Sequence, residues 1–592
     1  MSSSVIRRRA REAFYALAVC LLAGSWGCLS STSPPAIVRI DPPASPGSVT
    51  PHLTAAGETI LLSWFEPEGD AGRGTLRYSR LEHHGGTWRW NAPRRITSST
   101  SFFVNWADFP SIQQGGDGSL LVHWLEMMGS GKYAYGIQLA LSQDEGGSWR
   151  GLGMPHDDRA QVEHGFVSVV PERSGFRAFW LDGRETGAHA EGGAGGSTML
   201  RTARVDDRPG ADEEIDGRVC DCCQTGAVMT AEGPVVVYRD RSDGEIRDIS
   251  IVRWTGDGWT SPAPVAADSW RVPGCPVNGP AIAVDSTGRR LAVAWFTASF
   301  DRPRVQVAFS EDAGATFSMP IVVDRGEPLG RTAVAIDPAG DAIVAWTGSG
   351  NDQSAPLFAC RVSFAGGAAR RSERLLVSTG PGSRAAGFPR IAMAGESALV
   401  AWTEPGEAGG VRAAQVPAAL MTLERVVASR PAPTPGKARA WDGLPGSMAP
   451  AFEAVDLEGR PYLLASQRGH PVLLNVWATW CGPCKEELPM LSSLHAAHGP
   501  SGLHVVGVSV DGAGSRARVV EMVSDAHLTY RIVLDPEDRA SSLFRLSMLP
   551  ATFLFDADGV LVWRREGVIE PDDPGMAAAL ARVIDTTADP RQ

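Results

Sequence analysis

A short apolar segment that ends in an aromatic residue recurs about every 56 residues through the first two thirds of the chain. Its seven copies are centred on Trp64, Trp124, Trp180, Tyr238, Trp295, Trp346 and Trp402. Another short strand and a Gly/Asp turn precede each copy, and an alternating strand follows, so one repeat supplies three or four strands. Such units bury their faces only against one another. The pattern therefore predicts an all-β propeller of about seven blades over residues 45–427.

Two turns between these strands share the longer motif Ser-x-Asp-x-Gly-x-Ser/Thr-aromatic, over residues 142–149 and 310–317. We expect the Ser and Asp side chains to cap the backbone of the turn, while glycine supplies a positive φ and the aromatic ring packs on neighbouring strands. The motif resembles the Asp-box turns of the sialidase-like, BNR-repeat propellers. This resemblance supports the propeller and raises glycosidase activity as an alternative function.

A sialidase-like glycosidase needs an arginine triad, a Tyr/Glu nucleophilic pair, an acid Asp and an Arg-Ile-Pro signature. That signature is not found in the sequence. The residues that could line a polar mouth are Arg184, Arg239, Asp240 and Arg241. Tyr238 fits the series of repeated aromatics better than the role of a nucleophile. The propeller is thus predicted to be a binding platform.

Residues 428–447 are rich in Pro and Ala, a composition that favours an extended spacer between two folded units. Beyond them, over residues 448–592, short apolar strands alternate with helical stretches. Residues 472–476 and 504–510 are predicted to be strands on either side of a helix over residues 481–498. This alternation predicts a second domain with an α/β sheet.

The sequence Trp480-Cys481-Gly-Pro-Cys484 lies where a predicted strand gives way to this helix. The unpaired N–H groups and the positive dipole end of a helix favour a thiolate on Cys481, and Pro483 is tolerated in the first turn. Cys484 lies one turn further along, where it can resolve a mixed disulfide between Cys481 and a client. The pair is predicted to be a redox-active disulfide. A structural disulfide or half of a zinc site is the alternative.

The residues around this pair extend the motif. Positions 475–489 read Asn-Val-Trp-Ala-Thr-Trp-Cys-Gly-Pro-Cys-Lys-Glu-Glu-Leu-Pro, and positions 449–459 contain an Ala-Pro-Ala-Phe and Asp-Leu-Glu-Gly hairpin. Over residues 448–586 the chain resembles the TlpA-like extracytoplasmic thioredoxins of the thioredoxin superfamily. The resemblance implies an α/β thioredoxin fold for residues 448–592.

The same resemblance implies roles for two further residues. Pro550 falls where the family places a cis-proline, which lays an extended client segment against the dithiol and keeps metals off it. Glu487 falls where TlpA-like proteins place a buried carboxylate that exchanges a proton with Cys484. Asn475 replaces the buried Asp of cytosolic thioredoxins, so Glu487 is the expected substitute. A solvated Glu487 on the helix face is the alternative.

As a function, the resemblance implies thiol–disulfide exchange with exported client proteins, with no cofactor required and with electrons from a membrane donor. The propeller would bind a client or a partner, and the tether would raise the local concentration of thiols near it. Three alternatives stay open: a non-catalytic binding or scaffold protein, a thiol peroxidase, and the sialidase-like glycosidase. A thiol peroxidase shares the opening hairpin but needs a Thr one turn before its reactive cysteine.

Four further cysteines gather in the fourth predicted repeat and its loops: Cys220, Cys222, Cys223 and Cys275. In an oxidising compartment they could form two structural disulfides. They could also hold copper or zinc through thiolates, or serve as a thiol client of the redox domain. The sequence leaves these three interpretations open, whereas Cys360 is predicted to be a buried free thiol.

The first residues have the charged-then-apolar order of an export signal. Four arginines between positions 7 and 11 precede an apolar run over residues 13–24 that is too short to span a bilayer comfortably. Gly27-Cys28 resembles the end of a bacterial lipoprotein signal, although Ser25 stands where Leu is usual. Residues 1–28 are therefore predicted to be a signal that leaves a membrane-anchored, periplasmic or outer-surface lipoprotein with lipid on Cys28. An uncleaved anchor, or ordinary signal cleavage nearby, is the alternative. The formal charge of -12 argues against nucleic acid as a partner.

Overall fold

The computed structural model describes most of the chain from residue 35 to residue 585. The gaps fall at residues 70–71, 130, 132, 187–195, 273, 300–301, 327, 351–353, 381–383, 407, 426–440, 442, 444, 513, 547 and 570–572. The predicted signal, with its Cys28, and most of the predicted linker lie outside the described residues.

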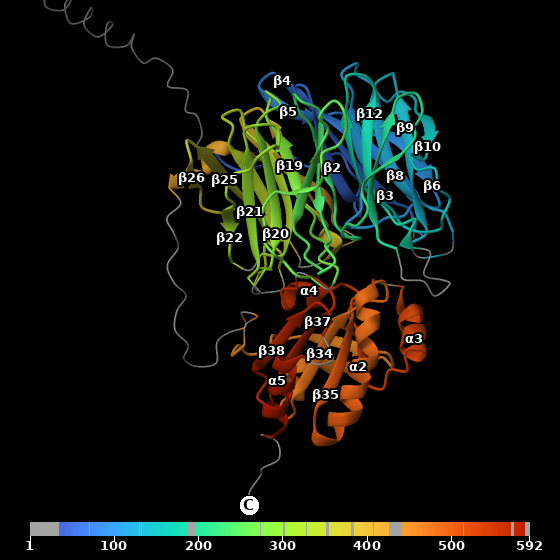
Figure 1. Cartoon of the computed structure of the whole chain (residues 1–592), viewed down its shortest axis with the longest axis vertical. Coiled ribbons are helices and arrows are strands. Elements are labelled where there is room, and N and C mark those ends of the chain that lie inside the picture. Colours follow the sequence, from blue (N-terminus) through green and yellow to red (C-terminus); the bar gives the residue numbers. More distant parts are fainter. Residues whose placement is uncertain are drawn as a thin grey trace, which may run out of the picture. The chain divides into compact units, whose positions relative to one another are not determined.

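The first two thirds of the described chain form seven antiparallel sheets of four to six strands each (Figure 1). In chain order the strands are β1 (Val38–Arg39), β2 (Val49–Ala56), β3 (Thr59–Pro67), β4 (Gly74–His84), β5 (Thr87–Trp90), β6 (Arg94–Ser99), β7 (Ser111–Gln114), β8 (Leu120–Met127), β9 (Tyr135–Ser142), β10 (Arg150–Gly153), β11 (His164–Pro171), β12 (Phe176–Asp182), β13 (Met199–Val205), β14 (Glu213–Asp216), β15 (Gly226–Met229), β16 (Pro234–Arg239), β17 (Ile249–Arg253), β18 (Ala263–Pro264), β19 (Ala281–Val284), β20 (Leu291–Thr297), β21 (Arg304–Ser310), β22 (Ile321–Asp324), β23 (Gly330–Ile336), β24 (Ala342–Thr347), β25 (Leu357–Ala365), β26 (Ala368–Arg371), β27 (Leu375–Ser378), β28 (Arg390–Ala394), β29 (Ser397–Glu404), β30 (Gly410–Pro417) and β31 (Glu424–Arg425).

The sheets are the blades of a closed ring. The first strands of neighbouring blades contact one another in the order β2, β7, β11, β15, β19, β23, β28 and back to β2. The last blade takes its outer strand from the start of the chain, because β1 pairs with β30 and so joins the two ends of the ring. Closure of this kind leaves each blade face covered by its neighbours. The predicted seven-bladed propeller is confirmed.

The repeated aromatic residues occupy one equivalent position in this ring. Each of the seven lies on the second strand of its blade, namely β3, β8, β12, β16, β20, β24 and β29. Six of them are buried and Trp124 is half-buried. Carboxylates accept hydrogen bonds from four of the buried indoles, as in the 2.8 Å bond from Trp180 Nε1 to Asp182 and the 2.8 Å bond from Trp346 Nε1 to Asp324. The indole ring thus fills the blade interface without leaving its N–H unpaired.

The two motif turns have the capping bonds that the sequence predicts. The Ser142 hydroxyl donates to Asp144 at 2.8 Å and accepts from the Gly146 N–H at 2.8 Å. Gly146 adopts a φ of 82°, in the left-handed region that glycine occupies without strain. Ser310 and Asp312 form the same bond at 2.8 Å in the later turn. Each turn therefore stabilises its own hairpin through a Ser and an Asp.

The C-terminal domain contains a seven-stranded sheet with helices packed on it (Figure 1). Its strands are β32 (Glu453–Asp456), β33 (Pro461–Leu463), β34 (Val472–Trp477), β35 (His504–Ser509), β36 (Arg531–Leu534), β37 (Ala551–Phe555) and β38 (Leu561–Glu566). Its helices are α2 (Gly482–His498), α3 (Arg516–Asp525), α4 (Arg539–Leu543) and α5 (Pro574–Asp585). The short 3-10 turns of the chain are η3 (Arg384–Ala386), η4 (Ala418–Leu420), η5 (Leu464–Gln467) and η6 (Gly499–Ser501).

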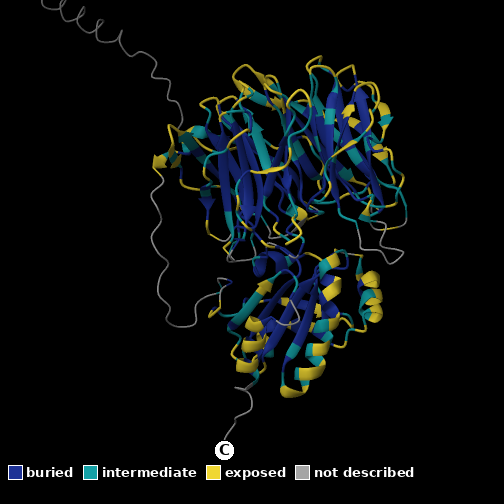
Figure 2. Ribbon diagram, in the orientation of Figure 1, coloured by how far each residue is buried: buried dark blue, intermediate teal, exposed yellow. Residues whose placement is uncertain are grey.

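The order of strands in this sheet is β33-β32-β36-β35-β34-β37-β38. Strand β34 is one of its central strands, parallel to β35 and antiparallel to β37. The central strands are buried on both faces, whereas the outward turns of the helices are exposed (Figure 2). This arrangement is the predicted thioredoxin fold. Among the described residues, we find no helix that combines the length and the apolar character needed to cross a membrane.

Candidate active site at the start of helix α2

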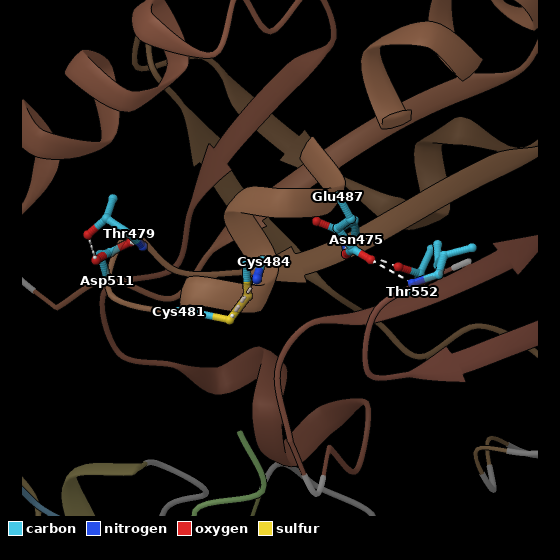
Figure 3. Close-up of a disulfide and its surroundings, with 8 residues drawn as sticks. Asn475, Thr479, Cys481, Cys484, Glu487, Asp511 and Thr552 are labelled. Carbon is cyan, nitrogen blue, oxygen red and sulfur yellow. Dashed lines mark hydrogen bonds between the residues drawn. A yellow bond between two sulfur atoms is a disulfide. The ribbon is translucent and has the colours of Figure 1, made fainter. Parts of the chain in front are cut away.

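A central strand of the C-terminal sheet leads the chain to the CxxC pair. Strand β34 ends at Trp477, and Cys481 caps helix α2. The Cys481 Sγ accepts a hydrogen bond from the backbone N–H of Cys484 at 3.2 Å. Pro483 stands in the first turn, where its missing N–H removes no helical bond. Cys481 and Cys484 are joined by a disulfide, with their Cα atoms 5.2 Å apart (Figure 3).

The position of the pair distinguishes its two sulfurs. Once the disulfide is reduced, the Cys484 N–H and the positive end of the helix dipole both stabilise negative charge on the Cys481 sulfur. Cys484 lies one turn inside the helix, within reach of that sulfur. Both side chains are 0% exposed. The geometry fits an attacking Cys481 and a resolving Cys484, and these roles stay predictions.

A hydrogen-bonded carboxylate fixes the turn that precedes Cys481. Asp511 accepts a bond from the Thr479 hydroxyl at 2.5 Å and another from the Thr479 backbone N–H at 2.8 Å (Figure 3). The Ser509 hydroxyl donates to the same carboxylate at 2.9 Å. Sequence reasoning missed Thr479 and Asp511, because they lie 32 residues apart and neither belongs to the CxxC motif. One signal could have indicated Asp511: it directly follows the predicted strand 504–510, which is expected beside the strand that leads to Cys481.

Glu487 is buried rather than solvated on the helix face. Its side chain is 2% exposed, and its oxygens accept bonds from the Asn475 amide at 2.6 Å and the Ile569 backbone N–H at 3.0 Å (Figure 3). Burial raises the pKa of Glu487 to about 7, although these two hydrogen bonds act in the opposite direction. Such a carboxyl can both take and return a proton near neutral pH. Its predicted exchange with Cys484 stays a prediction.

Pro550 follows a cis peptide bond, as the resemblance implied. In the sheet, Ala551 pairs with Val476. The turn that contains Pro550 and the turn that leads to Cys481 therefore lie at the same end of these two strands. This register places the cis-proline beside the CxxC motif. The role of Pro550 in seating a client is not tested by this arrangement and stays a prediction.

The propeller brings its four predicted cysteines together. Cys220, Cys222 and Cys223 lie between β14 and β15, and Cys275 lies between β18 and β19. The Cys220 sulfur is 3.2 Å from that of Cys223 and 3.9 Å from that of Cys222. Ligand atoms of Asp221, Cys222 and Cys275 all lie within 4.8 Å of one another. All four cysteines are free thiols in the structure. Their spacing suits thiolate ligands of a soft metal, and it also suits exchange between neighbouring sulfurs.

One arginine anchors this cysteine cluster. Arg247 Nη1 lies 3.4 Å from the Cys220 sulfur and 3.3 Å from the Asp221 carboxylate. Burial raises the pKa of Cys220, but bonds from Cys222 and Cys223 together with Arg247 outweigh it and hold that pKa well below its usual value. Sequence reasoning missed Arg247, which is 27 residues from Cys220. The cluster therefore contains one sulfur that is prepared to be a thiolate.

Other predicted residues of the propeller are structural. Cys360 is buried, and burial raises the pKa of its thiol to about 11. The prediction that Arg239 lines a polar mouth is wrong, because this side chain is 1% exposed. It donates to the backbone carbonyls of Asn278 and Phe296 at 2.7 and 2.8 Å. The Tyr238 hydroxyl donates to Asp216 at 2.6 Å, and burial raises its pKa. Tyr238 thus acts as a blade aromatic.

Arg184 and Arg241 are held by carboxylates. Arg184 donates to Asp182 at 2.9 Å and to Asp212 at 3.0 Å. Arg241 donates to Glu245 at 2.8 Å. These bonds occupy the guanidinium groups that the sequence suggested for a polar mouth. Arg184 and Arg241 are therefore held in separate ion pairs rather than in one site that binds an anion.

Comparison with known proteins gives relatives of the C-terminal domain. The model of the AhpC/TSA family matches residues 445–564. The thiol-disulfide oxidoreductase ResA of Geobacillus thermodenitrificans (strain NG80-2) is 37% identical over 114 residues, which cover 19% of this chain and 64% of that protein. ResA of Geobacillus kaustophilus (strain HTA426) is 34% identical over 129 residues, which cover 22% of this chain and 72% of that protein.

A solved structure adds a further likeness. The crystal structure of a thiol:disulfide interchange protein of the thioredoxin family from Chlorobium tepidum TLS is 20% identical, with a TM-score of 0.21, over 24% of this chain and 97% of that chain. This chain spans less than two thirds of the length of the first ResA relative. What the whole protein does is therefore a matter for proposal.

The fold and the site together define a class. A thioredoxin fold with a disulfide at the start of its helix is a thiol–disulfide oxidoreductase domain, and the ResA relatives carry that same description. Because the second relative is 34% identical over 72% of its length, the chain belongs to the family of the ResA thiol-disulfide oxidoreductases. Its propeller precedes the part that this family shares.

Proposed function

We propose that this chain is an exported oxidoreductase that exchanges disulfides with client proteins outside the cytoplasm. The observation that carries the proposal is the Cys481–Cys484 disulfide at the cap of α2, with the buried carboxyl of Glu487 on the same helix. Within the proposal, residues 45–427 together with β1 are the propeller, residues 428–447 the linker and residues 448–592 the redox domain. The propeller binds a client or a partner.

In the reducing direction the chemistry needs two steps. The Cys481 thiolate attacks a client disulfide, so that a mixed disulfide forms and one client sulfur leaves as a thiolate. The Cys484 sulfur then attacks Cys481, which closes the protein disulfide and releases the second client sulfur. Glu487 takes the proton that Cys484 loses. Two electrons pass from the protein to the client, no cofactor is required, and the reverse steps oxidise a client.

The place of action is proposed from the N-terminal sequence. A charged-then-apolar segment ends at Cys28, and lipid on this residue would hold the protein at a membrane surface. Exported proteins with cysteine pairs would be the clients, and a membrane protein would renew the reduced dithiol. The family match supports the chemistry, and the leader supports the compartment.

An insulin reduction assay tests the chemistry. With dithiothreitol as the reductant, the full chain should precipitate insulin faster than dithiothreitol alone, because Cys481 offers a stabilised thiolate. The Cys481→Ser variant should fall to the rate without protein. Cys360→Ser serves as the matched control, since it removes a buried thiol of the propeller, and it should keep full activity. Equal rates for the Cys481→Ser variant and the unaltered chain would favour the non-catalytic scaffold.

Two further assays address the remaining alternatives. A thiol peroxidase would consume hydrogen peroxide at a rate that depends on Cys481, faster than it reduces insulin. A glycosidase would release a fluorescent aglycone from a sialoside independently of both cysteines. We expect neither activity above background.

A further inference from the structure

Two propeller cysteines line a cavity that the CxxC turn also lines. The residues from Ile37 onward form one compact unit, and within it lies a cavity of about 550 Å³. Its walls include Cys222 and Cys275 from the propeller and Trp480, Gly482 and Pro483 from the turn around the disulfide. Two cysteines of the cluster and the turn around the redox disulfide therefore line the same space.

The backbone at Cys275 pairs with the segment before the cis-proline. The Cys275 N–H donates to the Leu549 carbonyl at 3.3 Å in an isolated antiparallel bridge, and Leu549 is joined to Pro550. A Cβ on Gly274 would lie only 3.1 Å from the Leu549 oxygen. The approach is therefore close enough to favour glycine at position 274. An extended segment with a cysteine lies where the proposed function seats a client.

The burial of the redox disulfide favours Cys275 over a client from outside the molecule. Cys481 is 0% exposed, so a client outside the molecule reaches it only after neighbouring groups withdraw. Cys275 already has its backbone held at the cis-proline turn. Its sulfur also has a partner, because the ligand atoms of Cys222 and Cys275 lie within 4.8 Å of each other. Two thiols this close can close a disulfide after a small side-chain rotation.

We propose that Cys222 and Cys275 are a built-in dithiol substrate of the Cys481–Cys484 disulfide. This inference rests on the proposed function and extends it to a client within the chain itself. The propeller is then an electron store for the redox domain, as well as a platform for partners. Arg247, bonded to Cys220 and Asp221, keeps the loop that contains Cys222 in position for the exchange.

The exchange balances without any further reactant. The Cys275 thiolate attacks the Cys481 sulfur, so the Cys481–Cys484 bond breaks, a Cys275–Cys481 bond forms, and Cys484 leaves as a thiolate. Cys222 then loses its proton and attacks Cys275, which closes Cys222–Cys275 and releases Cys481. Two electrons move from the propeller dithiol to the redox disulfide. The two protons lost by the propeller thiols are available to the new thiols, and the reverse path uses the same bonds.

Trapping of the intermediate tests the proposal in the full chain. The Cys222→Ser/Cys484→Ser variant removes both resolving sulfurs, so neither can break a disulfide between Cys275 and Cys481. The variant is reduced, oxidised with diamide at low protein concentration, alkylated and digested for mass spectrometry without reduction. We expect a peptide pair joined by a Cys275–Cys481 disulfide. The Cys275→Ser/Cys484→Ser control should lack it, because Cys275 is gone.

Two outcomes overturn the proposal. In the first, Cys481 stays unlinked to Cys275, while the unaltered chain and the Cys275→Ser variant both reduce insulin. This result would leave the proposed function standing. In the second, zinc or copper(I) binds stoichiometrically to the reduced chain, protects the propeller cysteines from alkylation and prevents the Cys275–Cys481 link. This result would make the cluster a metal site. Failure of the unaltered chain to reduce insulin would contradict the proposed function instead.

Discussion

At the scale of single residues, the chemistry depends on a carboxyl and a thiol that share one helix. Glu487 lies three positions after Cys484, turned toward Asn475 and the backbone of Ile569 instead of toward water. Burial moves its pKa from 4.5 to about 7. The carboxyl is therefore largely protonated below this pH and largely ionised above it, and only the ionised form can take a proton from Cys484.

The first prediction concerns the pH dependence of resolution. In the unaltered chain, the rate at which Cys484 displaces a client from Cys481 should rise as the pH passes upward through about 7. Glu487→Gln should slow this step by roughly 100-fold at high pH, the usual contribution of a general base, and should remove the rise at pH 7. Single-turnover stopped-flow kinetics with a fluorescent mixed disulfide would measure both.

The exposed neighbour provides the control for this prediction. Glu486 is one residue away on the same helix but is exposed, so Glu486→Gln removes an equal charge without removing a buried base. It should leave the rate and its pH profile unchanged. A profile in Glu487→Gln that still rises at pH 7 would show that another group takes the proton.

At the scale of elements, the aromatic repeat and the strand–helix alternation were enough to predict most of the architecture. The predicted helix over residues 481–498 is α2, and the seven aromatics all lie on the second strand of a blade. The pairing of β1 with β30 could not be predicted, because a two-residue strand has no periodicity. The bond between Thr479 and Asp511 depends on the neighbouring β34 and β35, which only the folded sheet brings together.

A tryptophan comparison tests how the blades are held. Trp346 is 0% exposed and donates its indole N–H to Asp324. Trp346→Phe leaves that carboxylate without this partner and opens a small void, so the free energy of propeller unfolding should fall by about 2 to 4 kcal/mol. Denaturant titration with hydrogen exchange of the blade peptides would measure the loss.

The second aromatic of the series is the matched control. Trp124 is half-buried, and among the described residues no acceptor meets its indole N–H. Trp124→Phe removes no hydrogen bond and should cost about 1 kcal/mol or less. If both substitutions lower the free energy of unfolding equally, the hydrogen bond to Asp324 adds no stability beyond the packing of the ring.

At the scale of the whole molecule, residues far apart in the sequence meet only through the ring. Cys222 and Cys275 lie in the two loops that flank the blade β15–β18, after β14 and before β19. Sequence spacing alone left structural disulfides, a metal site and a thiol client as open interpretations of these cysteines. The folded ring shows that the sulfurs gather beside the redox turn, which no pattern of local residues could show.

The proposed membrane anchor is a property of the whole chain. If Cys28 carries lipid, the full-length protein expressed in a bacterial host should incorporate labelled palmitate and sediment with membranes. Cys28→Ala should abolish the label and move the protein to the soluble fraction, while Cys20→Ala, a change in the same leader, should do neither. Label on the Cys28→Ala variant would contradict the anchor.

The central claim is that the start of α2 makes one sulfur of the reduced pair unusually nucleophilic. Its most direct measurement is the rate of iodoacetamide alkylation of the freshly reduced full chain between pH 5 and 9, with the modified residue identified by mass spectrometry. We expect Cys481 to react first, and faster than glutathione at pH 6, whereas Cys484 should react slowly. If neither cysteine reacts faster than glutathione at any pH, the assignment of Cys481 as the attacking sulfur is wrong.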